Sequence, residues 1–243
     1  MLWLFALIIT STVVVTVAWF RSKRSAKTVA FFHPYCNAGG GGERVLWCAV
    51  RAIFECHPDL RVAIYTGDTD VSAEKILENA EKRFNIPLTS IPNWRERLDF
   101  VFLTHRWLLE DRYYPAFTLL GQAVGGLLLG FEALWRLVPE TFIDSMGVPL
   151  TLPLFTYVAG SRTGCYVHYP MISTDMIRVV KDRKAAFNNR DVVSKSPILS
   201  WAKLIYYRLF ALLYGLAGRA AYVCLWHAFV LSFEAPGIKL GDA

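Results

Sequence analysis

The chain has 243 residues, of which 54% are hydrophobic and 14% aromatic, and its formal net charge is +6. This composition excludes a disordered chain, which has too few apolar residues to form a core, and it predicts a globular protein with membrane contact. The length suits one large domain or two small ones.

An uncharged apolar run occupies residues 2–20, and Arg21, Lys23, Arg24 and Lys27 follow it. A run of this length can span the core of a bilayer. A secretory signal peptide is the alternative, but it places basic residues before its apolar run and small residues at its cleavage site. We therefore predict that residues 1–27 are a retained anchor with a basic flank. Because basic flanks stay on the cytosolic side, the chain from Arg21 onward is expected in the cytosol.

Short apolar segments alternate with helical ones along the rest of the chain. The segments rich in β-branched and aromatic residues predict strands at residues 28–35, 61–68, 99–103, 141–145 and 164–169. Between the first two lies a predicted helix with an apolar face of Val45, Leu46, Cys48, Ala49, Ala52, Ile53 and Cys56. Repeated strand–helix units predict an α/β fold with a doubly wound parallel sheet.

Four consecutive glycines, Gly39, Gly40, Gly41 and Gly42, separate the first predicted strand from this helix. Ligands bind at the carboxyl ends of parallel strands, where a helix N-terminus offers N–H groups to phosphate. Glycine lets the backbone approach such a ligand, so we predict a phosphate-facing loop; a glycine-rich connection without a ligand is the alternative. Glu43 is expected to bond N–H groups in the first helical turn. The spacing suits a sugar nucleotide or phospholipid better than NAD, and no P-loop is present.

Two apolar segments, residues 117–139 and 199–233, are longer than the sheet requires. Each could be a buried helix, a helix on the membrane surface or a span, and we favour buried or interfacial packing. Residues 145–220 carry ten basic and three acidic side chains, which suits phosphates, an anionic bilayer or nucleic acid. The five cysteines form no CxxC pair, which predicts free thiols in a reducing compartment and no zinc site.

Seven motifs, in order between about residues 29 and 220, resemble one family: HPYCNAGGGGERVLW, YTGD, FTLLGQ, IDSMG, TLPLF, YVHYPMISTDM and KLIYY. They are similar to the eukaryotic α-1,2-mannosyltransferases that extend the dolichol-linked oligosaccharide of N-glycan assembly. The resemblance implies a GT-B fold, in which two Rossmann-like domains face each other across a cleft, with residues 28–221 as the N-terminal domain. It implies retaining transfer of mannose from GDP-mannose to Man3GlcNAc2-PP-dolichol and then to Man4GlcNAc2-PP-dolichol, on the cytosolic face of the endoplasmic reticulum.

The resemblance also implies roles for particular residues. His168 and Asp144, which end two predicted strands, would be catalytic, and Gly39 to Gly42 would bind substrate near the phosphates. His33 is expected to shape the glycine loop. Read from the residues alone, His168 could be a packed loop residue and Asp144 a turn residue. The implied partners are GDP-mannose as donor, the dolichol-pyrophosphate oligosaccharide, the membrane and other mannosyltransferases of the pathway, with no metal, no cofactor and no nucleic acid.

The chain departs from the family in length, because in the family a second Rossmann-like domain follows and binds the sugar nucleotide. Residues 222–243 lose the family pattern and are expected to add a last strand or lie on the membrane, with the strand favoured. We therefore expect a shortened chain that is inactive by itself. The alternatives are a non-catalytic membrane protein that binds lipid-linked oligosaccharide or a partner transferase, and an anchored NAD-dependent reductase with Asp59 as its ribose ligand.

Overall fold

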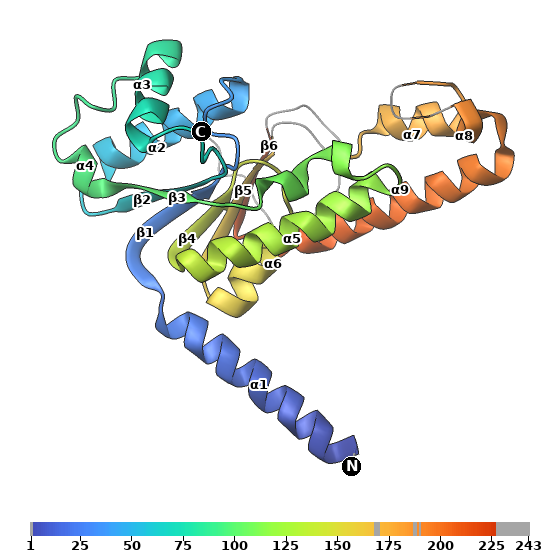
Figure 1. Cartoon of the computed structure of the whole chain (residues 1–243), viewed down its shortest axis with the longest axis horizontal. Coiled ribbons are helices and arrows are strands. Elements are labelled where there is room, and N and C mark those ends of the chain that lie inside the picture. Colours follow the sequence, from blue (N-terminus) through green and yellow to red (C-terminus); the bar gives the residue numbers. More distant parts are fainter. Residues whose placement is uncertain (1, 168–170, 187–188, 190, 227–243) are drawn as a thin grey trace, which may run out of the picture.

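The computed structural model describes residues 2–167, 171–186, 189 and 191–226. Within them, one parallel sheet has the strand order β3-β2-β1-β4-β5-β6 (Figure 1). The strands are β1 (Ser25–Phe32), β2 (Arg61–Thr66), β3 (Leu98–Phe102), β4 (Pro139–Asp144), β5 (Arg162–Val167) and β6 (Val223–Trp226). This order is that of a doubly wound sheet, so the predicted α/β class is confirmed. The last strand expected after residue 222 is confirmed over Val223–Trp226, and residues 227–243 lie outside the described residues.

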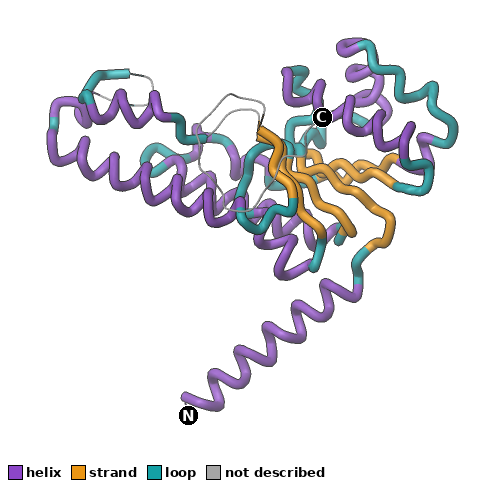
Figure 2. Tube along the Cα trace, turned by 180° about the vertical axis from the view of Figure 1, so that it is seen from behind, coloured by secondary structure: helices purple, strands orange, loops and turns teal. Residues whose placement is uncertain are grey.

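Helices cover both faces of the sheet (Figures 1 and 2). One face carries α2 (Gly41–Cys56), α3 (Ala73–Phe84) and α4 (Trp94–Arg97). The other carries α5 (Thr118–Arg136), α6 (Thr151–Pro153), the π-helical η3 (Leu154–Ala159) and α9 (Pro197–Gly218). The 3-10 turns η1 (Arg106–Leu109) and η2 (Asp111–Tyr113) precede α5, and α7 (Thr174–Lys181) and α8 (Asp191–Lys195) pack on the outer part of α9.

The central strands bury side chains on both faces. Along β1, Val29 and Phe31 join the core beneath α2 and α3, whereas Ala30 and Phe32 join the core beneath α5 and η3. In the second core the rings of Phe142 and Phe155 stack with centroids 3.7 Å apart. Parallel strands buried on both faces have nearly continuous apolar sequences, which is why they could be found as short apolar runs.

The buried face of α2 differs from the predicted face. Leu46, Trp47, Val50 and Phe54 are buried, while the predicted Cys48, Ala52 and Cys56 are exposed, so that part of the prediction was wrong. Apolar residues surround more than half of this helix, and their spacing alone does not choose a face. Burial of the large Trp47 and Phe54 rings removes more apolar area from water than burial of small Cys and Ala side chains, and this decides the rotation of the helix.

Helix α1 (Leu2–Ser22) leaves the body at the start of β1 (Figure 1). Two of the described helices, Trp3–Ser22 and Thr118–Arg136, are long and apolar enough to cross a membrane, with 6% and 39% of their most apolar windows buried. The last turn of α1 is tied to the body. Phe20 is buried in the core, Arg21 donates to the carbonyl of Tyr157 at 2.8 Å, and Arg24 donates to that of Gly160 at 2.7 Å.

Candidate functional site

The loops that follow β1 to β4 meet at the carboxyl edge of the sheet, where a doubly wound fold binds its ligands. The four glycines lie there, as predicted, where the loop after β1 leads into α2. Gly39 has a φ of +85°, Gly40 is the N-cap residue, and Gly41 and Gly42 already belong to the first turn of α2. Two of the four glycines are therefore loop residues and two are helical.

Gly39 has a positive φ angle and a guanidinium group close to its Cα atom. The Arg83 guanidinium, from α3, donates to the carbonyl of Ala38 at 3.0 Å. A Cβ atom on Gly39 would lie 1.3 Å from Arg83 Nη1. The absence of a side chain at this position thus lets a guanidinium group reach the glycine turn from α3.

A buried chain of hydrogen bonds supports the glycine turn. Glu43 Oε2 accepts from the N–H of Gly40 at 2.5 Å, and Glu43 Oε1 lies 3.4 Å from His33 Nε2. His33 Nδ1 is in turn 2.9 Å from Ser145 Oγ, at the end of β4. The hydrogen bond with His33 lowers the pKa of Glu43, against the opposing effect of burial. His33 therefore shapes the loop, and Glu43 bonds a backbone N–H group, as the sequence predicted.

A second network lies at the ends of β2 and β3. Asp68 Oδ2 accepts from the N–H of Asn37 at 3.0 Å, and Asp68 also pairs with Arg106. The Arg106 guanidinium lies 4.8 Å from the ring centroid of Tyr35, and its aliphatic part packs over Gly67. Neither Asp68 nor Arg106 was predicted from the sequence to have a role in the site. Asp68 is the last residue of the predicted strand 61–68, and this place at a strand end could have pointed to it, whereas no local pattern marks Arg106.

The Asp144 side chain is 1% exposed and bonds to the loop that follows it. Its carboxylate accepts from the N–H groups of Met146 and Gly147, both at 3.0 Å, and of Val148 at 2.6 Å. Burial raises the pKa of Asp144 to about 6, although these three donors act in the opposite direction. The contacts make Asp144 a positioning residue for this loop. A catalytic role for it stays a prediction, and His168, the other predicted catalytic residue, lies outside the described residues.

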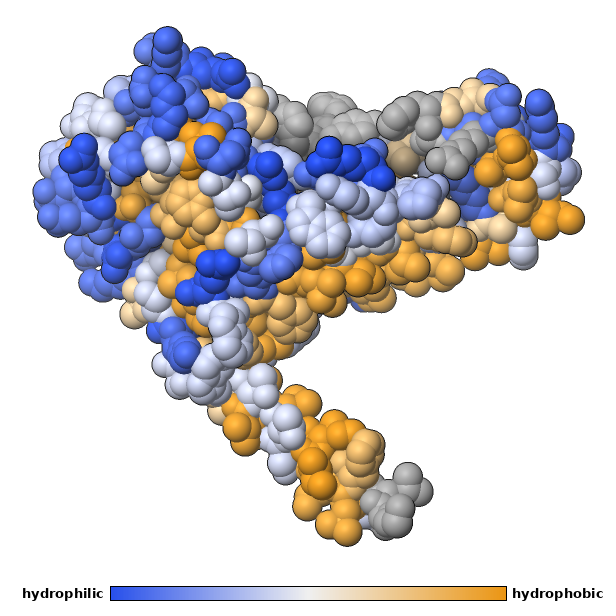
Figure 3. All heavy atoms as spheres, viewed as in Figure 1, coloured by the Kyte–Doolittle hydropathy of each residue, from blue (hydrophilic) through white to orange (hydrophobic). Residues whose placement is uncertain are grey.

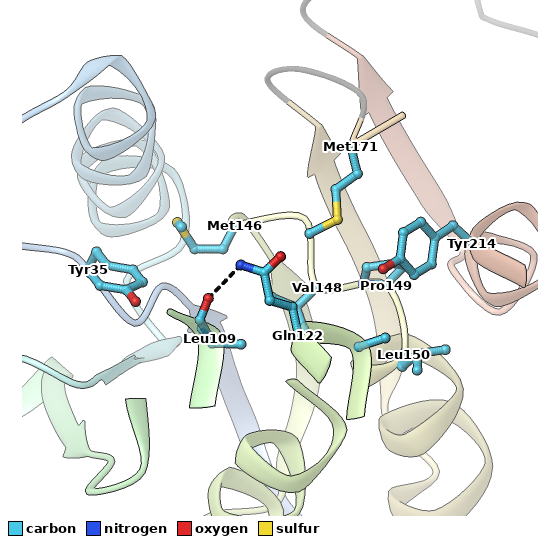
Figure 4. Close-up of a pocket in the computed structure, with 10 residues that line it drawn as sticks. Tyr35, Leu109, Gln122, Met146, Val148, Pro149, Leu150, Met171 and Tyr214 are labelled. Carbon is cyan, nitrogen blue, oxygen red and sulfur yellow. Dashed lines mark hydrogen bonds between the residues drawn. The ribbon is translucent and has the colours of Figure 1, made fainter. Parts of the chain in front are cut away.

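A small pocket opens beside this edge (Figure 4). Its volume is about 160 Å³, and its lining includes Tyr35, Gln122, Met146, Val148, Met171 and Tyr214. Gln122 donates to the carbonyl of Leu109 at 2.8 Å, which fixes its amide. Burial raises the pKa of Tyr214 to about 12, so its phenol stays protonated at neutral pH. The pocket thus combines aromatic and thioether surfaces with an amide and two phenols.

No group of three or more His, Cys, Asp and Glu side chains in the described part of the chain could hold a metal ion. The expectation that the reaction needs neither metal nor cofactor stays a prediction.

The chain was compared with known proteins. The family model described as ALG11 mannosyltransferase N-terminus matches residues 26–228. GDP-Man:Man(3)GlcNAc(2)-PP-Dol alpha-1,2-mannosyltransferase of Mus musculus is 55% identical over 203 residues, which are 84% of this chain and 40% of the relative. The protein of the same name from Homo sapiens is 52% identical, over 84% of this chain and 40% of the relative. The protein of the same name from Caenorhabditis elegans is 53% identical, over 83% of this chain and 42% of the relative. No solved structure matches the chain.

The chain therefore spans 40–42% of the length of these curated relatives. The matched residues include the glycine turn, its supporting network, Asp68, Arg106 and Asp144, as well as the whole pocket lining. Because the family model covers most of the chain, the chain belongs to the ALG11 mannosyltransferase N-terminus family.

Proposed function

We propose that this chain forms the acceptor-side wall of a membrane-anchored, retaining α-1,2-mannosyltransferase of GT-B architecture. Mannose passes from GDP-mannose to Man3GlcNAc2-PP-dolichol and then to Man4GlcNAc2-PP-dolichol, without a metal or further cofactor. The observation that carries the proposal is the 52–55% identity to mannosyltransferases over a range that includes the entire carboxyl edge of the sheet.

The glycine turn is the proposed phosphate-facing element. The first turn of a helix presents backbone N–H groups and a partial positive charge, both of which favour phosphate. Arg83 adds a full positive charge beside Gly39. His33, Glu43 and Asp144 do not need to touch substrate in this arrangement, because they position the two loops that border the edge.

The pocket is the proposed place for one group of the acceptor. Its volume of about 160 Å³ is below the roughly 300–1,000 Å³ of pockets that enclose a drug-sized ligand. It therefore suits a single sugar ring of a longer oligosaccharide. The rings of Tyr35 and Tyr214 offer stacking surfaces, and their phenols and the Gln122 amide offer hydrogen bonds (Figure 4).

The proposed location is the membrane of the endoplasmic reticulum, with α1 crossing once and the body in the cytosol. Arg21, Lys23 and Arg24 follow the apolar run and favour the cytosolic side. Lys23 Nζ lies 3.7 Å from the ring centroid of Trp19, an arrangement that suits an aromatic belt at the interface.

A hybrid enzyme tests the proposal. Residues 26–228 of this chain replace the matching segment of the Mus musculus relative, and the hybrid is expressed in cells that lack the transferase. The length of the lipid-linked oligosaccharide is measured together with the level of the protein. Restored oligosaccharide length supports the proposed function. A hybrid that is stable and binds lipid-linked oligosaccharide, but transfers no mannose, would favour a non-catalytic binding protein instead.

Two substitutions in the hybrid test individual residues. Gly40→Val should abolish transfer, because its Cβ would meet Glu43 Oε2 at 2.8 Å and displace the carboxylate that holds the turn. Gly215→Val, in an open stretch of α9, is the control. His168→Ala should lower turnover sharply without a loss of thermal stability, and His57→Ala is its control. Full activity of Gly40→Val or of His168→Ala would remove that residue from the site.

A further inference from the structure

Helix α5 exposes a stripe of large apolar side chains. Its buried face consists of five small residues and two leucines: Ala123, Gly125, Gly126, Leu129, Gly130, Ala133 and Leu134. On its exposed face Leu120, Val124, Leu128, Phe131 and Trp135 recur every three or four residues and are 44–70% exposed. A surface helix of a soluble domain has polar side chains on its exposed face. The outward face of α5 therefore fits an apolar environment.

The glycines explain how α5 packs on this side of the sheet. A Cβ on Gly125 would lie 2.2 Å from the carbonyl oxygen of Leu108, and a Cβ on Gly126 would lie 2.4 Å from Val148 Cγ1. The small residues thus face the body because the backbone approaches its neighbours closely there. Rotation of α5 to bury its large side chains is blocked by this packing.

Helix α9 carries a second exposed apolar stripe beside the first. Ile198, Trp201, Leu209, Leu212 and Leu216 lie on one face of the helix and are 49–79% exposed. The two helices contact each other through Tyr206, whose hydroxyl accepts from the N–H of Leu120 at 2.9 Å. Figure 3 shows apolar atoms along the lower edge of α5 and α9, on the side from which α1 leaves. We call these two stripes the apolar belt.

The apolar belt is continuous with α1. The Trp135 ring, at the end of the α5 stripe, lies 5.1 Å from the ring of Trp19 and 6.1 Å from that of Phe20. Phe20, Arg21 and Arg24 hold the end of α1 against the body, and the position of the apolar belt relative to the end of α1 is therefore fixed. Basic residues occur close to these apolar segments in the sequence: Arg21 and Arg24 follow the apolar run of α1, Arg136 ends α5 and Arg208 lies within α9.

We propose that the apolar belt lies in the bilayer surface, at the boundary between headgroups and acyl chains. An amphipathic helix in this position buries its apolar face while its basic side chains reach the headgroups. The body then contacts the membrane surface along α5 and α9, in addition to its attachment through α1. The pocket, whose lining includes Gln122 of α5 and Tyr214 of α9, is held close to the lipid surface. The proposal does not depend on the proposed catalytic function.

Fluorescence quenching on the full chain tests this placement. The exposed thiols of Cys48 and Cys56 are removed by substitution with Ser. Cys224→Ser is added, and a fluorophore is attached at one new cysteine at a time. Val124→Cys and Leu128→Cys report on α5, and Leu209→Cys and Leu212→Cys report on α9. Val13→Cys in α1 is the membrane control, and Glu78→Cys on α3 is the aqueous control. The labelled chains are reconstituted into vesicles of phosphatidylcholine and phosphatidylserine, and circular dichroism confirms their folding.

Belt positions are expected to be quenched by nitroxide-labelled lipid and protected from iodide in the aqueous phase, as Val13 is. Glu78 should show the opposite behaviour. Quenching of all four belt positions by iodide, to the extent seen at Glu78, would overturn the proposal. Protection from both quenchers would also overturn it and would indicate that a second copy of the chain covers the belt, which chemical cross-linking in the same vesicles would detect.

Discussion

Glu43 Oε1 lies 3.4 Å from His33 Nε2, in a buried contact that joins the first turn of α2 to the end of β1. The other carboxylate oxygen accepts from the N–H of Gly40, so one side chain connects the glycine turn to the sheet. Ser145 extends the connection to β4 through His33 Nδ1. The shape of the proposed substrate loop thus depends on side chains beneath it.

Glu43→Gln is expected to destabilise the chain by roughly 0.5–2 kcal/mol at pH 7, because it weakens the cap of α2 and the bond with His33. The pKa of Glu43 is lowered in the folded state. The advantage of the native residue is therefore fully present above the usual pKa of 4.5 and disappears as the pH falls through the lower, folded-state value. Urea unfolding in detergent micelles at several pH values measures it. Glu55→Gln, on the exposed side of α2, is the control, and equal effects of the two changes would contradict the prediction.

Gly39→Ala should destabilise the chain more than Gly147→Ala. Both glycines have positive φ angles, of +85° and +80°, so an alanine at either site carries a similar backbone strain of about 1–2 kcal/mol. No atom lies within 4 Å of a Cβ on Gly147, whereas a Cβ on Gly39 would displace Arg83. The difference between the two unfolding free energies isolates the contact with Arg83. Equal losses would show that the guanidinium moves aside at no cost.

Asp144→Asn tests the ionisation of this buried side chain, because an amide group resembles the protonated carboxyl and does not titrate. Burial raises the pKa of Asp144 from 3.8 to about 6, so its stabilising effect is greatest below the lower value and decreases as the pH rises through the higher one. The advantage of native over variant chain should therefore shrink by up to about 3 kcal/mol between pH 4 and pH 7. Urea unfolding midpoints of both chains across this pH range measure the difference in stability. If the advantage of the native chain grew with pH, the three N–H donors would affect the pKa of Asp144 more than burial does.

Gly125→Ala should destabilise the chain by about 1–3 kcal/mol, because its Cβ would overlap the backbone at Leu108, which cannot rotate away. Gly215→Ala is the control, since its Cβ meets no atom within 4 Å. The control should be stabilised by roughly 0.5–1 kcal/mol through helix propensity. Thermal unfolding of both variants in micelles gives the comparison. A stabilised Gly125→Ala chain would mean that α5 does not pack closely on η1.

A glycosylation acceptor sequence inserted at Asp70, in an exposed turn, should remain unmodified in cells because the body is proposed to lie in the cytosol. The same acceptor attached through a linker before Met1 should be glycosylated in the lumen. Gel mobility before and after treatment with a glycosidase measures both. Modification at Asp70 with none at the N-terminus would reverse the proposed orientation of α1.

The sequence by itself determined the parallel α/β sheet and the location of the glycine turn. Strands buried on both faces are short apolar runs between breakers, so β1 to β5 could be found locally. The residues at which the strands end could not be predicted as well. The first strand was expected to extend to Tyr35 but ends at Phe32, because His33 and the residues after it bond to side chains of other elements.

Tertiary structure decided the partners of the site and the outward face of α5. Ser145 is 112 residues from His33, and Arg83 is 45 residues from Ala38, so no local pattern could pair them. Apolar periodicity predicted a helix near residues 117–139, but apolar residues surround most of it. The close approach of η1 and of the loop after β4 leaves no room for a side chain at Gly125 and Gly126, and with these two glycines facing the body Leu128 and Trp135 are directed outward. Periodicity cannot show this, because it reports which residues are apolar and not how much room the neighbouring backbone leaves.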